Sequence, residues 1–312
     1  MAGLCSLLLS LVSLIAVRGA IGMHLHIRAD NSVPQSIVNT ISSYTPFAAM
    51  TYCSNTSIAE WKSALPNPVR VSDTQQWYIE ETGSRGYVTY DMDHNQVVVA
   101  FRGTTEIKSW VLDSEFVPES IGQDTSGNVV KVHDGFLVTY RSSQAIMISQ
   151  ITDVLCKHPG ASLVIVGHSL GAALATFVIL DGFGDPSKVS ASQFLKSRID
   201  PSHVTVYTFG SPRVGNLAFR NLVESFGVRF YRSVNYNDVV PHLPPESLQY
   251  VHVRTEYWIN ANFELVTCND ITNGEDTDCA NSLNISALLL QGDWSIPHDH
   301  FFNFDITSGF CV

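Results

Sequence analysis

The sequence predicts an α/β fold in which helices flank a central, mostly parallel sheet. Three observations predict it. Residues 95–101 and 162–166 are short, continuous apolar runs, which is the pattern of strands buried on both faces. Residues 142–157, which lie between these runs, carry apolar side chains at helical spacing. Hydrophobic residues make up 45% of the chain and charged residues only 15%, a balance that can build a large core.

The remaining segments continue this alternation of strands and helices. Strand-like runs occupy residues 86–90, 203–209 and 228–234, and helical patterns occupy residues 34–50 and 171–180. The helix at 171–180 is apolar nearly all round, so we expect it to be covered by other elements. No repeat, charge run or Pro/Ser-rich break divides the sequence, and we expect a single domain over residues 23–312.

Residues 1–22 are predicted to be a secretory signal peptide. Their apolar run, at residues 4–17, is too short for a comfortable membrane span and is followed by small residues. Cleavage is expected after Gly19 or Gly22, and the alternative is an uncleaved anchor. No other stretch could span a bilayer, so we expect a secreted, extracellular protein. Asn55 and Asn284 each begin an Asn-x-Ser motif, the glycosylation acceptor of secreted proteins.

The charge balance bears on the kind of partner. The 312 residues include 18 Lys and Arg against 29 Asp and Glu, a net charge of −11 with neutral His. This deficit of positive charge argues against a nucleic acid, whose phosphates must be neutralised. A lipid surface remains compatible, because apolar area can drive interfacial binding.

Once Cys5 is removed with the signal peptide, five cysteines remain: Cys53, Cys156, Cys268, Cys279 and Cys311. An odd number in an oxidising compartment implies two disulfides and one free thiol. Cys268 and Cys279 bracket a polar, acidic loop, so we expect a local bridge there, and Cys53 would then pair with Cys311. Cys156 lies in the helix at 142–157, where a buried, unpaired thiol is the simplest expectation.

A Gly-x-Ser-x-Gly motif at residues 167–171 directly joins a predicted strand to a predicted helix. This is the setting of the nucleophile elbow of α/β-hydrolases. Gly167 and Gly171 are expected because Cβ atoms there would clash where strand and helix approach. Ser169 would stand at a helix N-terminus, where the dipole and free N–H groups favour developing negative charge. The sequence therefore predicts Ser169 as a nucleophile, and the alternative is a tight turn without chemistry.

A serine nucleophile needs a general base, which follows it in the chain of this fold. Downstream, His203 and His252 lie in strand-like alternations and are expected to be packed residues. His298 and His300 lie in a loop before the last apolar segment. The residues alone leave the choice between these two open.

The base also needs an acid that orients it. Asp238 directly follows the strand at 228–234, so it should reach the same edge of the sheet as Ser169. Asp200, which precedes a strand, is the alternative.

Several segments together resemble the fungal class 3 lipases of the Rhizomucor and Thermomyces type, from about Tyr52 to Cys311. The matching segments are FRGT at 101–104, IKSW at 107–110, VHDGF at 132–136, the elbow at 167–171, FGSPRVGN at 209–216, NDVVP at 237–241, EYW at 256–258 and DHFFNF at 299–304.

The resemblance implies roles for individual residues. The catalytic His of this family precedes a hydrophobic, usually aromatic segment and a terminal Cys, which points to His300 and makes His298 a solvent-side neighbour. The resemblance also supports Asp238 as the acid. It implies an oxyanion hole formed by Thr104 and the backbone N–H of Leu170.

Residues 105–116 resemble the helical lid of the family. Ile107, Trp110 and Val111 fall on one face of a short helix, at positions i, i+3 and i+4. Such an apolar face suits both a closed lid over the site and contact with lipid. The pairings Cys53–Cys311 and Cys268–Cys279 resemble family bridges as well.

The implied function is that of a secreted, monomeric serine lipase that hydrolyses acylglycerol esters at a lipid–water interface, with no metal and no cofactor. A feruloyl esterase on the same scaffold is the alternative, although its lid is more polar than the segment around Trp110. A catalytically inactive relative that binds lipid or glycan would need a broken triad, and Ser169, Asp238 and His300 are all present.

Overall fold

The computed structural model describes residues 32–62, 69–113, 115–269, 274–291, 295–307 and 311. These described residues form one compact unit. The predicted signal peptide, residues 1–22, lies outside the described residues, so the domain boundary at residue 23 stays a prediction. Within the described part of the chain, no helix has both the length and the apolar character needed to cross a membrane.

The central sheet has eight strands in the order β1-β2-β3-β6-β7-β9-β11-β12. Neighbours from β3 to β11 run parallel, and the outer pairs are antiparallel. The mostly parallel, largely buried sheet that the apolar runs predicted is therefore confirmed. The strands are β1 (Val71–Ile79), β2 (Ser84–Asp91), β3 (Gln96–Phe101), β6 (Ser162–His168), β7 (Val204–Phe209), β9 (Arg229–Asn235), β11 (Glu256–Ile259) and β12 (Leu265–Thr267).

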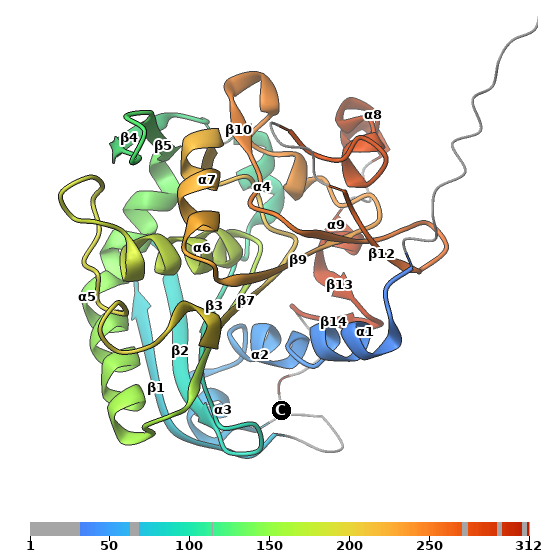
Figure 1. The fold of residues 1–312 in the computed structure, drawn as a ribbon. Helices are drawn as coiled ribbons and strands as arrows, with labels where there is room; N and C mark the ends of the chain where they lie inside the picture. The colour runs from blue at the N-terminus through green and yellow to red at the C-terminus, as the bar shows by residue number, and fades with distance from the viewer. Residues whose placement is uncertain are drawn as a thin grey trace, which may run out of the picture. The chain divides into compact units, whose positions relative to one another are not determined.

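Helices cover both faces of this sheet (Figure 1). One hydrophobic core joins the sheet to α5 (Asp134–Lys157), α6 (Leu170–Phe183) and α7 (Leu217–Ser225). A second core, on the opposite face, contains α1 (Gln35–Ser42), α2 (Thr45–Met50) and part of α3 (Asn55–Glu60). The C-terminal hairpin β13 (His300–Phe301) and β14 (Phe304–Asp305) packs against the second core.

Two predicted helices differ in their bounds. The segment at 34–50 forms two helices, because a proline is tolerated only in the first turn of a helix and Pro46 lies in the first turn of α2. The helix predicted at 142–157 starts earlier, at Asp134. His133 caps it, since Nδ1 of His133 accepts a hydrogen bond from the backbone N–H of Phe136 at 3.4 Å.

A second, four-stranded sheet was not predicted. Its order is β10-β8-β5-β4, and two of its strands have only two residues, too few for a periodic pattern. These strands are β4 (Pro118–Gln123), β5 (Val129–His133), β8 (Gly215–Asn216) and β10 (Tyr250–Val251). The remaining elements are α4 (Ile107–Asp113), α8 (Ile285–Gln291), α9 (Ser295–Asp299) and 3-10 turns at Pro201–His203, Val240–His242, Glu246–Leu248 and Ala280–Ser282.

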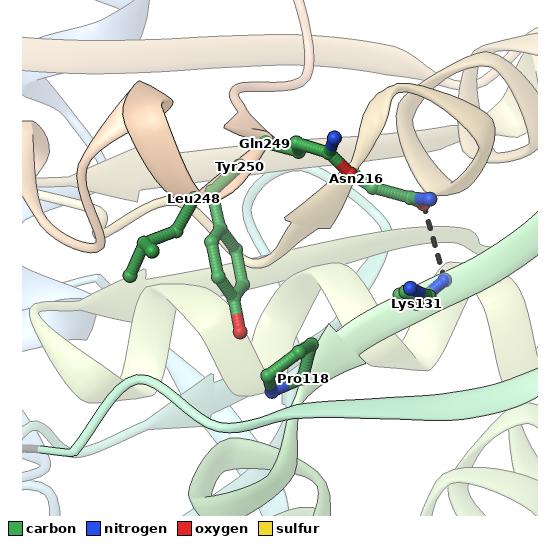
Figure 2. Close-up of a pocket in the computed structure, with 6 residues that line it drawn as sticks. All are labelled: Pro118, Lys131, Asn216, Leu248, Gln249 and Tyr250. Atoms are coloured by element: carbon green, nitrogen blue, oxygen red, sulfur yellow. Dashed lines mark hydrogen bonds between the residues drawn. The ribbon is translucent and has the colours of Figure 1, made fainter.

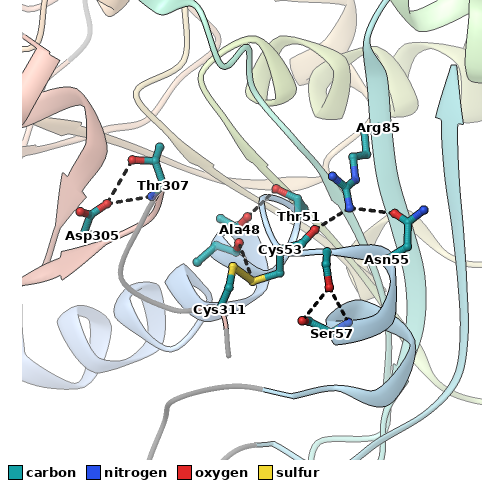
Figure 3. Close-up of a disulfide and its surroundings, with 11 residues drawn as sticks. Ala48, Thr51, Cys53, Asn55, Ser57, Arg85, Asp305, Thr307 and Cys311 are labelled. Carbon is teal, nitrogen blue, oxygen red and sulfur yellow. Dashed lines mark hydrogen bonds between the residues drawn. A yellow bond between two sulfur atoms is a disulfide. The ribbon is translucent and has the colours of Figure 1, made fainter. Parts of the chain in front are cut away.

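Both predicted disulfides are present. Cys53, just after α2, is bonded to Cys311 (Figure 3), and Cys268 is bonded to Cys279. Cys156 is unpaired as predicted, but it is exposed, so the expectation that it is buried is wrong. The core-facing side chains of this part of α5 are those of Ile151 and Val154, and Cys156 falls on the solvent face.

A buried ion pair holds the segment after β9. Arg213 donates from Nε and Nη2 to the two carboxylate oxygens of Glu275, each at 2.7 Å, and both side chains are buried. Its Nη1 also donates to the carbonyl oxygens of His242 and Pro244, at 2.6 and 3.0 Å. The backbone N–H of Arg213 donates to the carbonyl oxygen of Leu243 at 2.7 Å. The guanidinium group and the backbone N–H of Arg213 therefore hold residues 242–244 in place.

His242 is itself buried in this network. Burial, and after it the charge of Arg213, lowers the pKa of His242 to about 4. Nε2 of its ring has no hydrogen-bond partner among the described residues. The folded chain therefore holds this ring in its neutral form at pH values where the unfolded chain would protonate it.

Replacing Cys53 and Cys311 together by alanine is expected to lower the free energy of unfolding by about 5 kcal/mol, and replacing Cys268 and Cys279 by about 3 kcal/mol. The larger effect follows from chain entropy, because the sequence separations of the two bridges are 258 and 11. Urea unfolding without reductant measures both losses. Equal losses would contradict the entropic explanation.

Acidification is expected to destabilise the fold between about pH 6.5 and pH 4. In this window the unfolded chain takes up a proton at His242 and the folded chain does not, so stability falls with pH, by about 3 kcal/mol for this residue. His242→Phe should make the fall shallower, and His203→Asn, at an exposed position, should leave it unchanged. Urea unfolding at several pH values tests this, and an unaltered slope in His242→Phe would count against it.

Candidate active site

Ser169 lies at the turn between β6 and α6, as the elbow motif predicted. Its backbone has φ 57° and ψ −130°, a region that side-chain-bearing residues rarely adopt. A Cβ atom at Gly167 would lie 2.3 Å from the carbonyl oxygen of Gly171. A Cβ atom at Gly171 would lie 2.3 Å from the carbonyl oxygen of Phe101. The glycines therefore allow three backbone segments to meet beneath the serine.

Asp238 reaches the same edge of the sheet from the loop after β9. Its carboxylate is fully buried. Oδ1 accepts a hydrogen bond from the backbone N–H of Val240 at 2.9 Å, and Oδ2 lies 2.9 Å from Nδ1 of His298. The backbone of Gly210, with φ +59°, packs directly against both side chains. A Cβ atom at this position would lie 2.8 Å from Asp238 Oδ2 and 2.8 Å from His298 Nδ1.

The histidine beside Asp238 is His298, and the assignment of this place to His300 is wrong. His298 is 1% exposed, whereas the side chain of His300 is 47% exposed. Nδ1 of His300 lies 2.9 Å from the carbonyl oxygen of Ile296. The physical reason is local structure: α9 turns His298 inward, and His300 follows the helix end on the short strand β13. Pro297, in the first turn of α9, is the sequence signal that could have indicated this helix.

Oγ of Ser169 and Nε2 of His298 are both buried. Because the Asp238 carboxylate can only accept, Nδ1 of His298 donates to it, and Nε2 is left as the acceptor. Within the described part of the chain, neither Nε2 of His298 nor Oγ of Ser169 has a hydrogen-bond partner.

The segment after β3 lies against the serine. A Cβ atom at Gly103 would lie 2.6 Å from Cβ of Ser169, so the neighbouring Thr104 is close to the elbow. Oγ1 of Thr104 accepts a hydrogen bond from the backbone N–H of Glu106 at 3.1 Å. Leu170 is the first residue of α6, where a backbone N–H has no helical partner. Thr104 and Leu170 therefore both lie close to Ser169.

The predicted lid forms the short helix α4, and the apolar face of this helix packs against the rest of the protein. The ring of Trp110 stacks on Phe136, with centroids 5.9 Å apart. Val111 is buried in a cluster with which Ile107 also packs. That cluster contains Val239, Val240, Leu243 and Leu288. The helix therefore rests on the loop that follows Asp238 and on α8, and it leaves Leu112 74% exposed.

Two groups of described side chains have the spacing of metal ligands: His168, His298 and Asp299, and Glu256, Cys268 and Cys279. In each group at least two members are engaged in other interactions. His298 faces Asp238, and the two cysteines share a disulfide.

A small pocket lies apart from the serine, in the second sheet (Figure 2). It is lined by Pro118, Lys131, Asn216, Leu248, Gln249 and Tyr250. The hydroxyl of Tyr250 is buried without a partner among the described residues, and burial raises the pKa of Tyr250 to about 12. None of the residues around the elbow lines this pocket.

Comparisons with known proteins agree with this geometry. Residues 98–248 match the family model of class 3 lipases. The chain is 31% identical to a lipase of Rhizomucor miehei over 280 residues, which cover 88% of this chain and 70% of that protein. It is 36% identical to the secreted mono- and diacylglycerol lipase A of Penicillium cyclopium over 193 residues, or 61% of this chain and 57% of that protein.

Solved structures extend the agreement to the whole fold. One of these structures is described as showing that a serine protease triad forms the catalytic centre of a triacylglycerol lipase. It superposes with a TM-score of 0.73 at 28% identity, covering 88% of this chain and 98% of that one. Because the similarity to the Rhizomucor miehei lipase extends over most of both sequences, the chain belongs to the class 3 lipase family.

Proposed function

We propose that this chain is a serine lipase that hydrolyses acylglycerol esters, with Ser169 as nucleophile, His298 as base and Asp238 as its orienting acid. The observation that carries the proposal is the buried Asp238–His298 pair, 2.9 Å apart, together with a serine in a strained turn whose neighbour His168 lies against His298, with ring centroids 4.6 Å apart. Such pairs orient an imidazole so that its other nitrogen can take the serine proton.

The reaction has two halves. Oγ of Ser169 attacks the ester carbonyl carbon while Nε2 of His298 takes its proton, and the resulting oxyanion accepts hydrogen bonds from Thr104 and the N–H of Leu170. His298 then gives the proton to the departing alcohol, which leaves an acyl-enzyme. Water, deprotonated by His298, attacks the acyl carbon, and the fatty acid and the free serine are released.

The surroundings favour the charges that form in these steps. Asp238 stabilises the imidazolium ion of His298, and the N-terminus of α6 stabilises the oxyanion. Because Ser169 is 1% exposed, little water competes for these interactions.

The same burial means that substrate must first displace a covering segment. We infer that α4 is this lid, because its apolar face packs on the loop that carries Asp238. Movement of α4 would expose the side chains of Ile107, Trp110 and Val111 to a lipid surface, alongside the already exposed Leu112. The buried apolar face favours a lipid ester over a ferulate ester as substrate.

We also propose that the protein is secreted and glycosylated. The two disulfides are stable in an oxidising compartment. Asn55 and Asn284 are exposed, at the start of α3 and just before α8, so solvent reaches both acceptor residues. Ser169, Asp238 and His298 come from one chain, which supports action as a monomer.

Ser169→Ala and His298→Ala are each expected to lower kcat by at least about 10⁴-fold. His300→Ala, at an exposed position, should stay within about twofold. Hydrolysis of emulsified tributyrin measures the rates, and a serine-reactive phosphonate measures loss of labelling in Ser169→Ala. The assignment of His298 as the base would be contradicted if His300→Ala lost most of its activity while His298→Ala stayed active. Activity on methyl ferulate but not on tributyrin would contradict the lipase proposal.

Leu112→Ser should weaken interfacial binding, raising the lipid area needed for half-maximal rate by about tenfold or more. Met92→Ser is the matched control: Met92 is 48% exposed but lies before β3, at the end opposite to the site. Rates on emulsified tributyrin, and on tributyrin below its solubility limit, separate binding from chemistry. An equal loss on both substrate forms would argue against an interfacial role.

A further inference from the structure

A chain of hydrogen bonds runs behind the candidate site through two side chains that the reaction does not use. The backbone N–H of Gly103 donates to the hydroxyl oxygen of Tyr52 at 3.0 Å. That hydroxyl lies 2.7 Å from Nδ1 of His168. Nε2 of His168 lies 2.8 Å from the backbone carbonyl oxygen of His298. The path joins four segments that are far apart in the sequence.

The direction of every hydrogen bond in this series follows from which atoms can donate and which can only accept. The carbonyl oxygen of His298 can only accept, so Nε2 of His168 carries a proton. Burial, and after it the neighbouring His298, lowers the pKa of His168 well below its usual value, so the ring is neutral and Nδ1 accepts. Burial raises the pKa of Tyr52, so its hydroxyl keeps the proton that it donates to Nδ1. One arrangement of protons therefore satisfies all three bonds.

Three residues along this series of bonds are, or directly precede, groups that must be placed accurately for ester hydrolysis. Gly103 precedes Thr104, which we assign to the oxyanion hole, and His168 precedes Ser169. The third contact is made by the backbone of His298 itself. Oxyanion donor, nucleophile and base are thus connected to one another through Tyr52 and through His168, the last residue of β6.

The contacts around both rings leave little freedom. A Cβ atom at Gly103 would lie 2.5 Å from the hydroxyl oxygen of Tyr52, so the loop and this ring are in close contact. The ring of His168 lies edge to face with Tyr52, at 5.7 Å, and 4.6 Å from the ring of His298. Tyr52 is also the residue before Cys53, which is bonded to Cys311.

We propose that Tyr52 and His168 are positioning residues, which hold Thr104, Ser169 and His298 in register for attack on the ester. The inference rests on the proposed function, since it assigns no bond-making step to either residue. Their effect is exerted on the transition state, whose oxyanion and imidazolium need simultaneous alignment.

Tyr52→Phe removes one hydroxyl and keeps the ring. Tyr87→Phe is the matched control, because the hydroxyl of Tyr87 is likewise buried and donates at 2.7 Å, but to the carbonyl oxygen of Phe47 in α2, away from the elbow. Tyr52→Phe is expected to lower kcat on tributyrin below its solubility limit by roughly 10- to 100-fold, with KM changed less than about threefold. Tyr87→Phe should keep the wild-type kcat. Its unfolding midpoint should fall by about as much as that of Tyr52→Phe, because each variant loses one buried hydroxyl group.

Affinity for a trifluoromethyl ketone, which forms a tetrahedral adduct with the serine, gives a second readout. It should fall in proportion to kcat/KM in Tyr52→Phe, while inhibition by butyrate is unchanged. His168→Gln, whose amide N–H can still reach the carbonyl oxygen of His298, should retain more activity than His168→Leu.

A Tyr52→Phe variant with wild-type kcat, or a loss equal to that of Tyr87→Phe, would overturn the inference. So would equal activity in the two His168 variants. These outcomes are distinct from failure of the proposed function, in which the wild-type protein itself would neither hydrolyse tributyrin nor react with the ketone.

Discussion

The structure depends on the close approach of three backbone segments at one point. The end of β3, the end of β6 and the start of α6 meet where a Cβ atom on Gly103, Gly167 or Gly171 would come within 2.6 Å of a neighbouring atom. This contact forces Ser169 into its positive-φ conformation at the head of α6. The loops that carry Thr104 and Asp238 leave the same edge of the parallel sheet, so they are brought together by the same approach.

Much of this arrangement could be predicted because it depends on local patterns. Buried parallel strands carry continuous apolar runs, and the elbow needs small residues at fixed spacing, so β3, β6 and Ser169 were all recognised from the sequence. Asp238 was found by its place after a strand. The disulfide pairs followed from one acidic loop and the remaining cysteines.

The predictions that failed depend on which way a side chain turns. His298 and His300 have similar neighbours in the sequence, and only the helical turn of α9 separates the inward residue from the outward one. Cys156 lies in an apolar helix but on its solvent face. Tyr52 and His168 carried no signal, because their role depends on partners distant in the chain, such as Gly103 and His298.

The bridge between Cys53 and Cys311 has a consequence for when the molecule can become active. It joins positions separated by 258 residues, so on the ribosome it cannot close until nearly all of the described chain has been synthesised. His298 emerges in the same late portion, more than a hundred residues after Ser169. A nascent chain therefore carries Ser169 well before His298 has been synthesised, and the disulfide can join the early and late parts of the chain only after both are present.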